Sequence, residues 1–349
     1  MTCHSYHEIQ TREELLDKAK DIFTQASYGI SAEARRSASL DFIAHKASHR
    51  LLIKVHLNID AFKQSHSLEI NLLASIFSGT GLLIGERQNK DRKMEDHVVY
   101  ERHGIPTVNL STLNYILDHD AYLEVCAKRG GLYVQINSQK LKMAREKHQL
   151  SIQNLANFLN KSPRTIYLYE KGVISPSKED AEKLKHLFND CSFIEPIDIL
   201  KYSPEKISTY IQNLLKTNYF QFPRNSLQED VNEHLKNLGM KTFWLRSLPF
   251  DAMALVGDKK EATQMPVITG VSSEIGKRSI KERIIVTNNI LSLLQSVGIW
   301  IHEENDDPSA ILDIDGISLL SFEEFESIEA LKELFKVLRQ KKSKNKPKS

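Results

Sequence analysis

The amino-acid sequence predicts an α/β protein with an all-α domain in the middle of the chain. On both sides of residues 139–188, short apolar runs typical of strands alternate with segments of helical apolar spacing, and inside that range only the helical spacing occurs. A length of 349 residues suggests two or three domains. We therefore expect an N-terminal α/β domain (1–128), a helical domain (129–200), a C-terminal α/β domain (201–338) and a basic tail (339–349).

The N-terminal region has the pattern of a mixed sheet covered by helices. Residues 10–27 carry apolar side chains on one helical face, and residues 68–77 do so again. Short apolar runs bounded by polar residues or glycine predict the strands. We expect strands within 39–55, on either side of a polar turn at Lys46–His49, and at 82–86, 98–101 and 104–109, followed by a helix that ends near Leu117.

The central region predicts a domain of four to five short helices. Ser151, Ser162 and Ser177 each precede an apolar-periodic segment, where a serine hydroxyl can accept a hydrogen bond from the first helical turn. Pro163 follows one of these caps directly, at a position where its missing N–H costs nothing. The expected helices end near His148, at Leu159, before Gly172 and near Phe188.

The second and third of these helices are joined by only a tight polar turn, Asn160–Lys161. Ala156 is a small residue where the two helices must cross closely, which describes a helix-turn-helix. Residues 139–188 resemble the λ-repressor/Cro-type helix-turn-helix family. The resemblance rests on Leu155–Ala156, Ser162, Thr165–Ile166, Tyr169–Gly172 and Pro176–Ser177. It implies that the helix beginning at Ser162 enters the major groove of double-stranded DNA.

Side chains on the outer face of that helix are the expected DNA contacts. Arg164 is the leading candidate for a base edge, because its guanidinium can pair with O6 and N7 of guanine. Tyr167 could stack on a thymine methyl group or bind a phosphate, and Lys171 suits a phosphate. The family often has glutamine where this chain has Ile152, with Gln153 one position later. The expected DNA-binding residues are Ser151, Gln153, Ser162, Arg164, Thr165, Tyr167, Leu168 and Lys171.

The charge distribution agrees with DNA binding. Residues 139–188 contain ten Lys/Arg and five Asp/Glu, a net charge of +5, whereas the whole chain carries +2. Basic charge is therefore concentrated where DNA phosphates would lie. The alternative for this pattern is a helical bundle that binds protein or RNA.

The C-terminal region repeats the order of the N-terminal one. Five phrases have counterparts, at offsets of 210–217 residues for four and 231 for the fifth: 40–44 with 250–254, 51–55 with 267–271, 58–59 with 289–290, 81–86 with 298–303, and 104–109 with 316–321. Five matches in one order predict a diverged internal duplication.

Two other segments lie outside these domains. Pro196 and Pro204 bracket a segment that we expect to be a hinge or a strand. Residues 339–349 hold six Lys/Arg and no acidic residue. They predict a disordered tail, or an arm that binds DNA without sequence specificity.

Most of the chain also resembles an archaeal family of HTH-type transcriptional regulatory proteins. The similarity is closest between Asp41 and Leu200 and looser after Lys201. The phrases that carry it are LDFIA (40–44), LLIKV (51–55), LLIGER (82–87), HGIPTVN (103–109), GGLYVQI (130–136) and EPIDIL (195–200). The resemblance implies a transcriptional regulator.

The flanking domains also allow a nuclease interpretation. Restriction-endonuclease-like folds place an acidic residue before a strand ending in Asp/Glu-x-Lys, because two carboxylates hold a divalent metal and the lysine steadies the attacking water. Asp41 and Lys54 have suitable positions, but Leu52 stands where the second carboxylate is needed. In the C-terminal region Asp251 is kept, whereas Thr269–Gly270 replaces the lysine position. A restriction-endonuclease-like fold stays open for both domains, a metal-dependent nuclease is the disfavoured alternative, and both aspartates could equally cap strand ends.

Several other classes find no support in the sequence. Cys3, Cys126 and Cys191 lie far apart without metal-ligand spacing, and the 13 histidines form no recognisable ligand set. No phosphate-binding glycine loop or nucleophile elbow occurs. The N-terminus has no signal-peptide core and no apolar run reaches the ~20 residues that span a bilayer. We expect a cytoplasmic protein, not an enzyme, with no catalytic residue, metal or cofactor and no membrane partner.

The sequence therefore predicts a sequence-specific DNA-binding transcriptional regulator. The flanking α/β domains would supply dimerisation, contacts with the transcription machinery or the binding of a small-molecule effector. A homodimer is expected because two recognition helices set ~34 Å apart match one turn of DNA.

Overall fold

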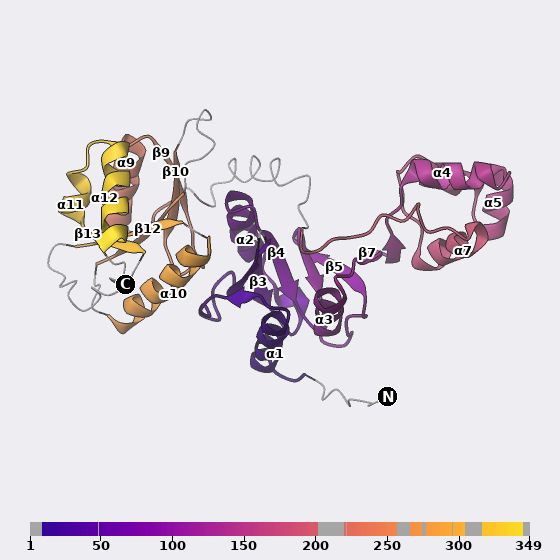
Figure 1. Cartoon of the computed structure of the whole chain (residues 1–349), viewed down its shortest axis with the longest axis horizontal. Helices are drawn as coiled ribbons and strands as arrows, with labels where there is room; N and C mark the ends of the chain where they lie inside the picture. Colours follow the sequence, from indigo (N-terminus) through magenta and orange to yellow (C-terminus); the bar gives the residue numbers. More distant parts are fainter. Residues whose placement is uncertain are drawn as a thin grey trace. The chain divides into compact units, whose positions relative to one another are not determined.

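The computed structural model describes the chain as two compact units. The described residues are 9–47, 49–201, 220, 222–256, 266–273, 277–294, 296–303 and 316–344, the last six by their backbone alone. The first unit comprises Met1–Ala26, Val55–Phe62 and Leu82–Tyr202, and the second comprises Ser27–Lys54, Lys63–Gly81 and Ser203–Ser349. Helices and two sheets, with a helical domain in mid-chain, confirm the mixed α/β class (Figure 1).

The first unit contains part of a mixed sheet and two packed helices. Its elements are α1 (Arg12–Gln25), the 3-10 helix η1 (Ile59–Ala61), β4 (Thr80–Ile84), β5 (Val98–Arg102), β6 (Ile105–Val108), α3 (Leu110–His119), β7 (Val125–Lys128) and β8 (Gly131–Val134). The strands lie in the order β4-β6-β5-β7-β8. Strand β6 lies between β4 and β5, and all four of its residues are buried. Helix α1 packs against α3, which Asn109 caps by accepting a bond from the N–H of Thr112.

The helical domain follows β8 in the same unit. Its helices are α4 (Ser138–Lys147), α5 (Ile152–Leu159), α6 (Pro163–Glu170) and α7 (Lys178–Phe188). The serine caps expected at Ser151, Ser162 and Ser177 are present, and each accepts a hydrogen bond from the N–H three residues later. Apolar side chains from all four helices form one core that includes Leu141, Leu155, Ala156, Leu159, Ile166, Tyr169, Ala181, Leu184 and Phe188.

The second unit begins with an antiparallel arrangement. Its first elements are β1 (Gly29–Ile30), β2 (Phe42–Lys46), β3 (His49–Val55) and α2 (Gln64–Ile76). The order β1-β2-β3 is followed by the first two residues of β4. In the hairpin, Phe42 lies opposite Ile53 and Lys46 lies opposite His49. The polar turn predicted between the two strand runs is therefore the turn of this hairpin.

A five-stranded sheet forms the C-terminal part of the second unit. Its elements are α9 (Ser226–Asn237), β9 (Met240–Trp244), β10 (Ala252–Val256), β11 (Val267–Ser272), α10 (Arg278–Leu294), β12 (Val297–His302), β13 (Ile317–Ser321), α11 (Phe322–Glu326) and α12 (Leu331–Lys344). The strand order is β13-β12-β11-β10-β9. Strand β10 pairs antiparallel with β9 and β11, and β12 pairs parallel with β11 and β13.

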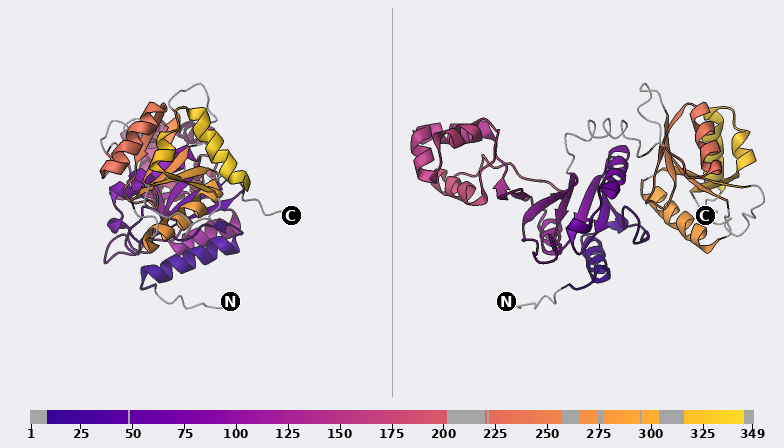
Figure 2. Two further views of the ribbon diagram at one scale, coloured as in Figure 1. Left: turned by 90° about the vertical axis from the view of Figure 1, so that its left-hand side faces the viewer. Right: turned by 180° about the vertical axis from the view of Figure 1, so that it is seen from behind.

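Helices cover both faces of this sheet. Helix α10 lies on one face, and α9, α11 and α12 lie on the other (Figure 2). Alternation along β12 produces the two faces. Ile299 and Ile301 belong to the core formed with α9, α11 and α12. Gly298 lies on the α10 side, where an added Cβ would be 2.5 Å from Cδ1 of Leu291. Both faces of the strand are therefore closely packed.

The structure corrects three details. Helix α12 continues through residues 339–344, expected to be disordered, because Lys and Arg favour helices and their charge suits a helix C-terminus. Asn58 caps η1 whereas Asn289 lies inside α10, so the match at the 231-residue offset joins unlike elements. Of the hinge or strand expected after Pro196, no regular strand forms within the described residues, where Ile197 makes a single bridge to Leu123, and the hinge stays a prediction.

Candidate nucleic-acid interface

Helices α5 and α6 are joined by the tight turn of a helix-turn-helix. Asn160 ends α5 with a φ of 54°, in the left-handed region that asparagine tolerates better than most residues. Ser162 then starts α6, and Pro163 occupies its first turn. Ala156 is fully buried between the two helices, so its small side chain permits their close approach. The turn therefore fixes the direction in which α6 leaves α5.

The outer face of α6 presents basic and aromatic side chains. Arg164, Tyr167 and Lys171 are exposed. Lys171 Nζ lies 5.6 Å from the centre of the Tyr167 ring, so these two side chains are neighbours. Arg164 makes no hydrogen bond or ion pair with any residue that the structure describes. Its guanidinium is available to an external acceptor.

The other expected contact residues have local roles. The Ser162 and Thr165 hydroxyls lie 2.9 Å apart, and Ser162 also accepts the bond that caps α6. Leu168, in the same helix, is half-buried. Ser151 caps α5, and the exposed Gln153 donates to Asn157, one turn later, over 2.9 Å. The structure thus places Arg164, Tyr167 and Lys171 on the face of one helix, and Ser151 and Gln153 at the start of another.

A buried ion pair that the sequence did not reveal holds α6 in place. Arg145 of α4 contacts Glu170 through two bonds, Nε–Oε1 at 2.5 Å and Nη2–Oε2 at 3.0 Å. The bond with Glu170 raises the pKa of Arg145. Arg145 Nη1 also donates to the carbonyl of Leu150 before α5. The residues are 25 positions apart, so no local pattern signals the pair.

A second polar link joins α6, α7 and the α5–α6 turn. Tyr169 donates to Asp180 over 3.4 Å, and Lys161 Nζ lies 3.2 Å from the same carboxylate oxygen. Burial, followed by the Asp180 charge, raises the pKa of Tyr169. The phenol therefore stays protonated and keeps its hydrogen bond at neutral pH.

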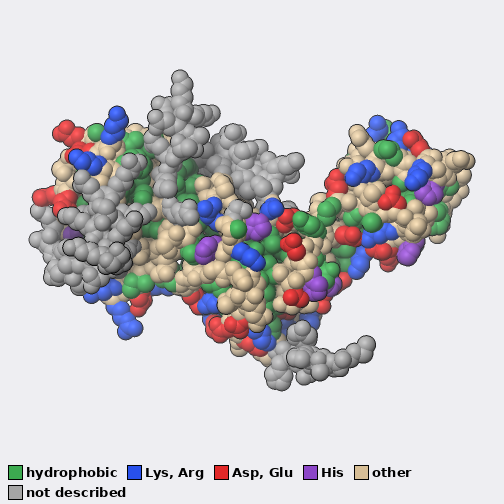
Figure 3. All heavy atoms as spheres, in the orientation of Figure 1, with side chains coloured by type: hydrophobic (Ala, Val, Ile, Leu, Met, Phe, Trp, Pro, Cys, Tyr) green, Lys and Arg blue, Asp and Glu red, His purple; other side chains and the backbone are tan. Residues whose placement is uncertain are grey.

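Basic and acidic side chains mix on the visible face of the helical domain (Figure 3).

The nuclease-like positions in the second unit form a closed cluster. Lys54 is 1% exposed, and its ammonium group lies 3.0 Å from Asp41 Oδ1. The same ammonium donates to the carbonyls of Arg36 and Ala38, at 3.2 and 2.6 Å. Three donors thus have three acceptors inside the protein. A lysine held this way is poorly placed to steady a catalytic water.

Glu69 of α2 is a fully buried carboxylate that the sequence interpretation overlooked. It accepts hydrogen bonds from the Ser39 hydroxyl and from the backbone N–H groups of Arg246 and Ser247. Its bonds therefore tie segments 177 residues apart within the second unit. Within the described residues, no group of three His, Cys, Asp or Glu side chains has metal-binding geometry.

Asp251, like Asp41, donates its backbone N–H to a residue of the next strand, but its carboxylate pairs with an arginine instead of a lysine. Its carboxylate accepts from the N–H of Val271 and from Arg283 Nη2, both at 2.9 Å. At Gly270, where a nuclease pattern needs lysine, an added Cβ would lie 2.2 Å from the Trp300 ring. Arg283 therefore supplies from α10 the positive charge that the strand cannot carry.

Comparisons with known proteins match both parts of this description. Residues 12–122 match a PD-(D/E)XK superfamily domain, and residues 141–195 match a helix-turn-helix model. A relative from Pyrococcus furiosus is 30% identical over 293 residues, covering 84% of this chain and 88% of that protein. Relatives from Thermococcus gammatolerans and Methanothermobacter thermautotrophicus are each 28% identical and cover 94% and 95% of this chain and 97% of their own lengths. All three bear the name "Putative HTH-type transcriptional regulatory protein".

The chain belongs to this family. No solved structure matches it. In this HTH-type family member, the helix-turn-helix match contains α5 and α6 with all the residues expected to contact DNA. The PD-(D/E)XK match contains Asp41, Lys54 and Glu69. None of the helices in the described part of the chain has the length and apolar character needed to cross a membrane.

Proposed function

We propose that this chain is a sequence-specific DNA-binding transcriptional regulator and that α6 reads the major groove. The exposed guanidinium of Arg164, which has no partner among the described residues, carries the proposal, because it lies on a helix whose other side is held by a buried ion pair. A preorganised arginine can pair with both acceptors of a guanine edge. The neighbouring Tyr167 and Lys171 extend the same face toward a base methyl group and a phosphate.

The start of α5 fits a supporting role on the DNA backbone. Ser151 and Gln153 lie at its N-terminus, where backbone N–H groups favour an anion. The Ser162 cap and the neighbouring Thr165 hydroxyl stabilise the start of α6. Together with Leu168, these residues would lie close to the DNA groove that α6 enters. In this assignment Arg164 specifies sequence, whereas Lys171 and the α5 residues add affinity.

The flanking α/β domains are proposed to dimerise the protein and to bind an effector or the transcription machinery. A homodimer would present two copies of α6 to half-sites one helical turn apart, so the operator should have two-fold symmetry. We also propose that the C-terminal domain is a diverged repeat of the N-terminal one. Its support is that the N–H of Asp41 donates to the carbonyl of Ile53, as that of Asp251 does to Thr269.

Selection from a random duplex-DNA library at near-physiological salt tests the main proposal. We expect an enriched, two-fold-symmetric motif. Arg164→Ala should weaken binding to that motif by about 10- to 100-fold, since a bidentate contact is worth about 1–3 kcal/mol. Lys171→Ala should weaken binding to all sequences alike and lower the salt slope by about one. Lys183→Ala, on an exposed position of α7, is the matched control.

Two outcomes would count against this function. A library without an enriched motif would remove sequence specificity, and an Arg164→Ala effect no larger than that of Lys183→Ala would remove the role of α6. RNA or protein binding through the same helices would then be the better account.

Metal-dependent cleavage is the second candidate, favoured by the PD-(D/E)XK match over residues 12–122. The buried Asp41–Lys54 pair and the apolar Leu52 argue against it, because two carboxylates are needed to hold the metal. Incubation of duplex DNA with the protein and Mg²⁺ or Mn²⁺ should give no cut product. Cleavage that Asp41→Asn abolishes would make the protein a nuclease.

A further inference from the structure

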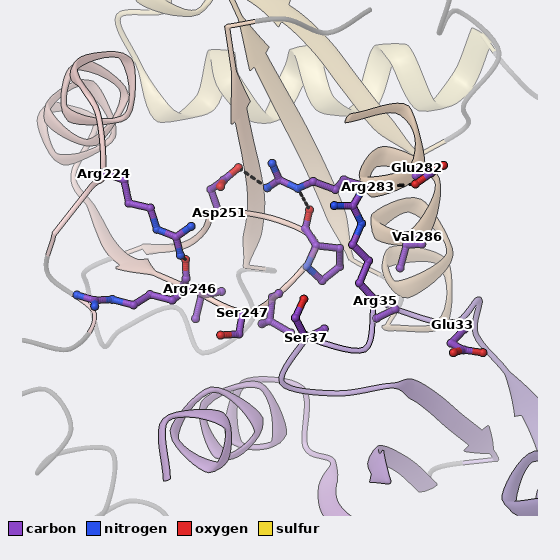
Figure 4. A pocket seen from close by; sticks show the side chains of 15 residues that line it. Glu33, Arg35, Ser37, Arg224, Arg246, Ser247, Asp251, Glu282, Arg283 and Val286 are labelled. Carbon is purple, nitrogen blue, oxygen red and sulfur yellow. Dashed lines mark hydrogen bonds and ion pairs between the residues drawn. The ribbon is translucent and has the colours of Figure 1, made fainter. Parts of the chain in front are cut away.

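A cavity of about 570 Å³, lined by charged and apolar side chains, lies within the second unit. Its walls come from residues 33–35 and 37–38, Arg224, residues 245–249, Asp251 and helix α10 (Figure 4). This volume is within the ~300–1,000 Å³ typical of small-molecule sites. The cavity shares no residue with the helix-turn-helix domain, so its occupant would not be bound by α6.

Arginine is the most frequent charged residue in the wall. Arg35, Arg224, Arg246 and Arg283 all line the cavity. Figure 4 shows Arg246 extending away from the other three, which leaves Arg35, Arg224 and Arg283 as the side chains directed at its interior. Three guanidinium groups around one cavity indicate an anionic ligand, because a guanidinium fork matches phosphate or carboxylate oxygens.

These three arginines retain unused donors. Each guanidinium has five N–H groups. Among the residues that the structure describes, Arg35 donates only through Nη2, to the Ser279 carbonyl and Glu282, and Arg224 donates only through Nη2, to the Leu245 carbonyl. Arg283 uses Nε and Nη2. A ligand can therefore be bound without breaking the bonds that orient Arg224 and Arg283.

Two of the three acidic residues of the wall are already paired with cations. Asp251 is already paired with Arg283 and with the N–H of Val271. Glu282 lies 3.3 Å from Arg35 and 3.1 Å from Arg278, which does not line the cavity. If a ligand draws Arg35 away, Glu282 keeps its second cation. Release of Arg35 therefore leaves no unpaired carboxylate.

The wall is also preorganised. Arg283 donates to the Pro249 carbonyl over 2.9 Å and stacks 5.2 Å from the centre of the Trp300 ring. Glu69 accepts hydrogen bonds from the backbone N–H groups of Arg246 and Ser247, and so fixes the wall segment that follows β9. Donors held this way lose little conformational freedom when a ligand binds.

We propose that this cavity binds a phosphorylated small molecule of nucleotide size. Arg35, Arg224 and Arg283 contact its phosphate oxygens, and the exposed carboxylates of Glu33 and Glu282 accept bonds from its hydroxyl or amino groups. This assignment rests on the effector role proposed for the flanking domains and names the chemistry of that effector.

Titration calorimetry of the full chain with pyrophosphate, ATP and adenosine tests the assignment. We expect pyrophosphate and ATP to bind and adenosine not to bind. Arg35→Gln and Arg224→Gln should each weaken ATP binding by about 10-fold or more, as expected for a lost charge-assisted bond. Arg92 is an exposed arginine outside the cavity, so Arg92→Gln should leave the affinity for ATP within about 2-fold of that of the unchanged protein.

Other results would overturn the assignment. Absence of binding by both phosphate probes, or equal weakening by Arg92→Gln, would show that the cavity does not take phosphate. If citrate bound as tightly as pyrophosphate, the cavity would select oxyanions in general and not phosphate. If Arg35→Gln weakened duplex-DNA binding as much as ATP binding, the surface would belong to nucleic acid. Arg164→Ala should leave ATP binding unchanged, which separates failure here from failure of DNA reading.

Discussion

Arg145 of α4 and Glu170, the last residue of α6, form a two-pronged ion pair that is more than nine-tenths buried. The pair replaces hydration that both charges lose in the core of the helical domain. Because Arg145 also holds the Leu150 carbonyl, one side chain fixes the end of α6 and the entry to α5. The direction of α6, and with it the position of Arg164, depends on this contact.

Removal of one partner should loosen α6. Arg145→Met leaves the Glu170 carboxylate buried without its cation, and breaking such a pair destabilises by about 3–5 kcal/mol. We expect faster hydrogen exchange of the α6 amides and weaker DNA binding. The matched control is Lys142→Met, because Lys142 pairs with Glu146 at 3.8 Å with both side chains 55% exposed. The double change Arg145→Met with Glu170→Leu should recover part of the protection.

Loss of the Glu69 carboxylate should loosen the cavity wall. Glu69→Ala leaves the Ser39 hydroxyl and the N–H groups of Arg246 and Ser247 without this acceptor, at about 1–3 kcal/mol for each unsatisfied donor. Both tryptophans, Trp244 and Trp300, belong to the second unit, so their fluorescence reports its unfolding.

We therefore expect a lower urea midpoint by tryptophan fluorescence in Glu69→Ala. The midpoint should fall less in Glu69→Gln, which keeps one carbonyl oxygen as an acceptor. Glu233→Ala removes an exposed carboxylate of α9 in the same unit and should leave the midpoint nearly unchanged. Equal effects of Glu233→Ala and Glu69→Ala would contradict the role given to Glu69.

Local signals in the sequence were sufficient for the helix-turn-helix. The helix predicted from Ile152 to Leu159 has these bounds, and Pro163 begins the next helix after the Ser162 cap. Each signal acts within about four residues, through a cap, a turn or an apolar face. For the same reason the outward position of Arg164 could be read from helical spacing alone.

The contacts that fix these elements could not be predicted in this way. Arg145 and Glu170 are 25 positions apart, and Glu69 meets the N–H of Arg246 across 177 positions. Such pairs depend on tertiary placement, which one sequence does not encode as a repeat or a cap. The nuclease pattern drew attention to Asp41 and Lys54, but their ion pair and the two carbonyls that complete the lysine's bonds could not be predicted, because the carbonyls belong to an irregular segment.

Acid should destabilise the second unit through His66. Burial, with the charges of Lys54 and Lys63, lowers the pKa of His66 from 6.5 to about 4. Between these values the unfolded chain binds a proton that the folded chain does not, so the free energy of unfolding falls as the pH decreases from 6.5 toward 4. The shift corresponds to about 3 kcal/mol at most.

Urea unfolding followed by tryptophan fluorescence at pH 7.5, 6 and 5 measures this dependence. His66→Gln should show a shallower loss of stability in this range than the unchanged protein. His186→Gln, at an exposed position of α7, should keep the original slope. The same slope in His66→Gln would assign the acid sensitivity to other groups.

Gly270 and Trp300 explain why the C-terminal domain pairs its aspartate with an arginine from α10. An added Cβ at Gly270 would lie 2.2–2.5 Å from three atoms of the Trp300 ring, a much closer approach than real side chains make. Gly270→Ala should therefore destabilise the second unit, by about 1–3 kcal/mol for an overpacked core. Gly270→Lys should be worse because it also brings a second charge beside Arg283.

A compensating change distinguishes steric conflict from a backbone effect. Trp300→Leu opens the space beside β11, so Gly270→Ala should lower the urea midpoint less in the Trp300→Leu background than in the original protein. Trp300→Leu alone supplies the reference, and Trp244 remains as the fluorescent reporter. An equal effect of Gly270→Ala in both backgrounds would mean that the indole ring does not exclude the side chain.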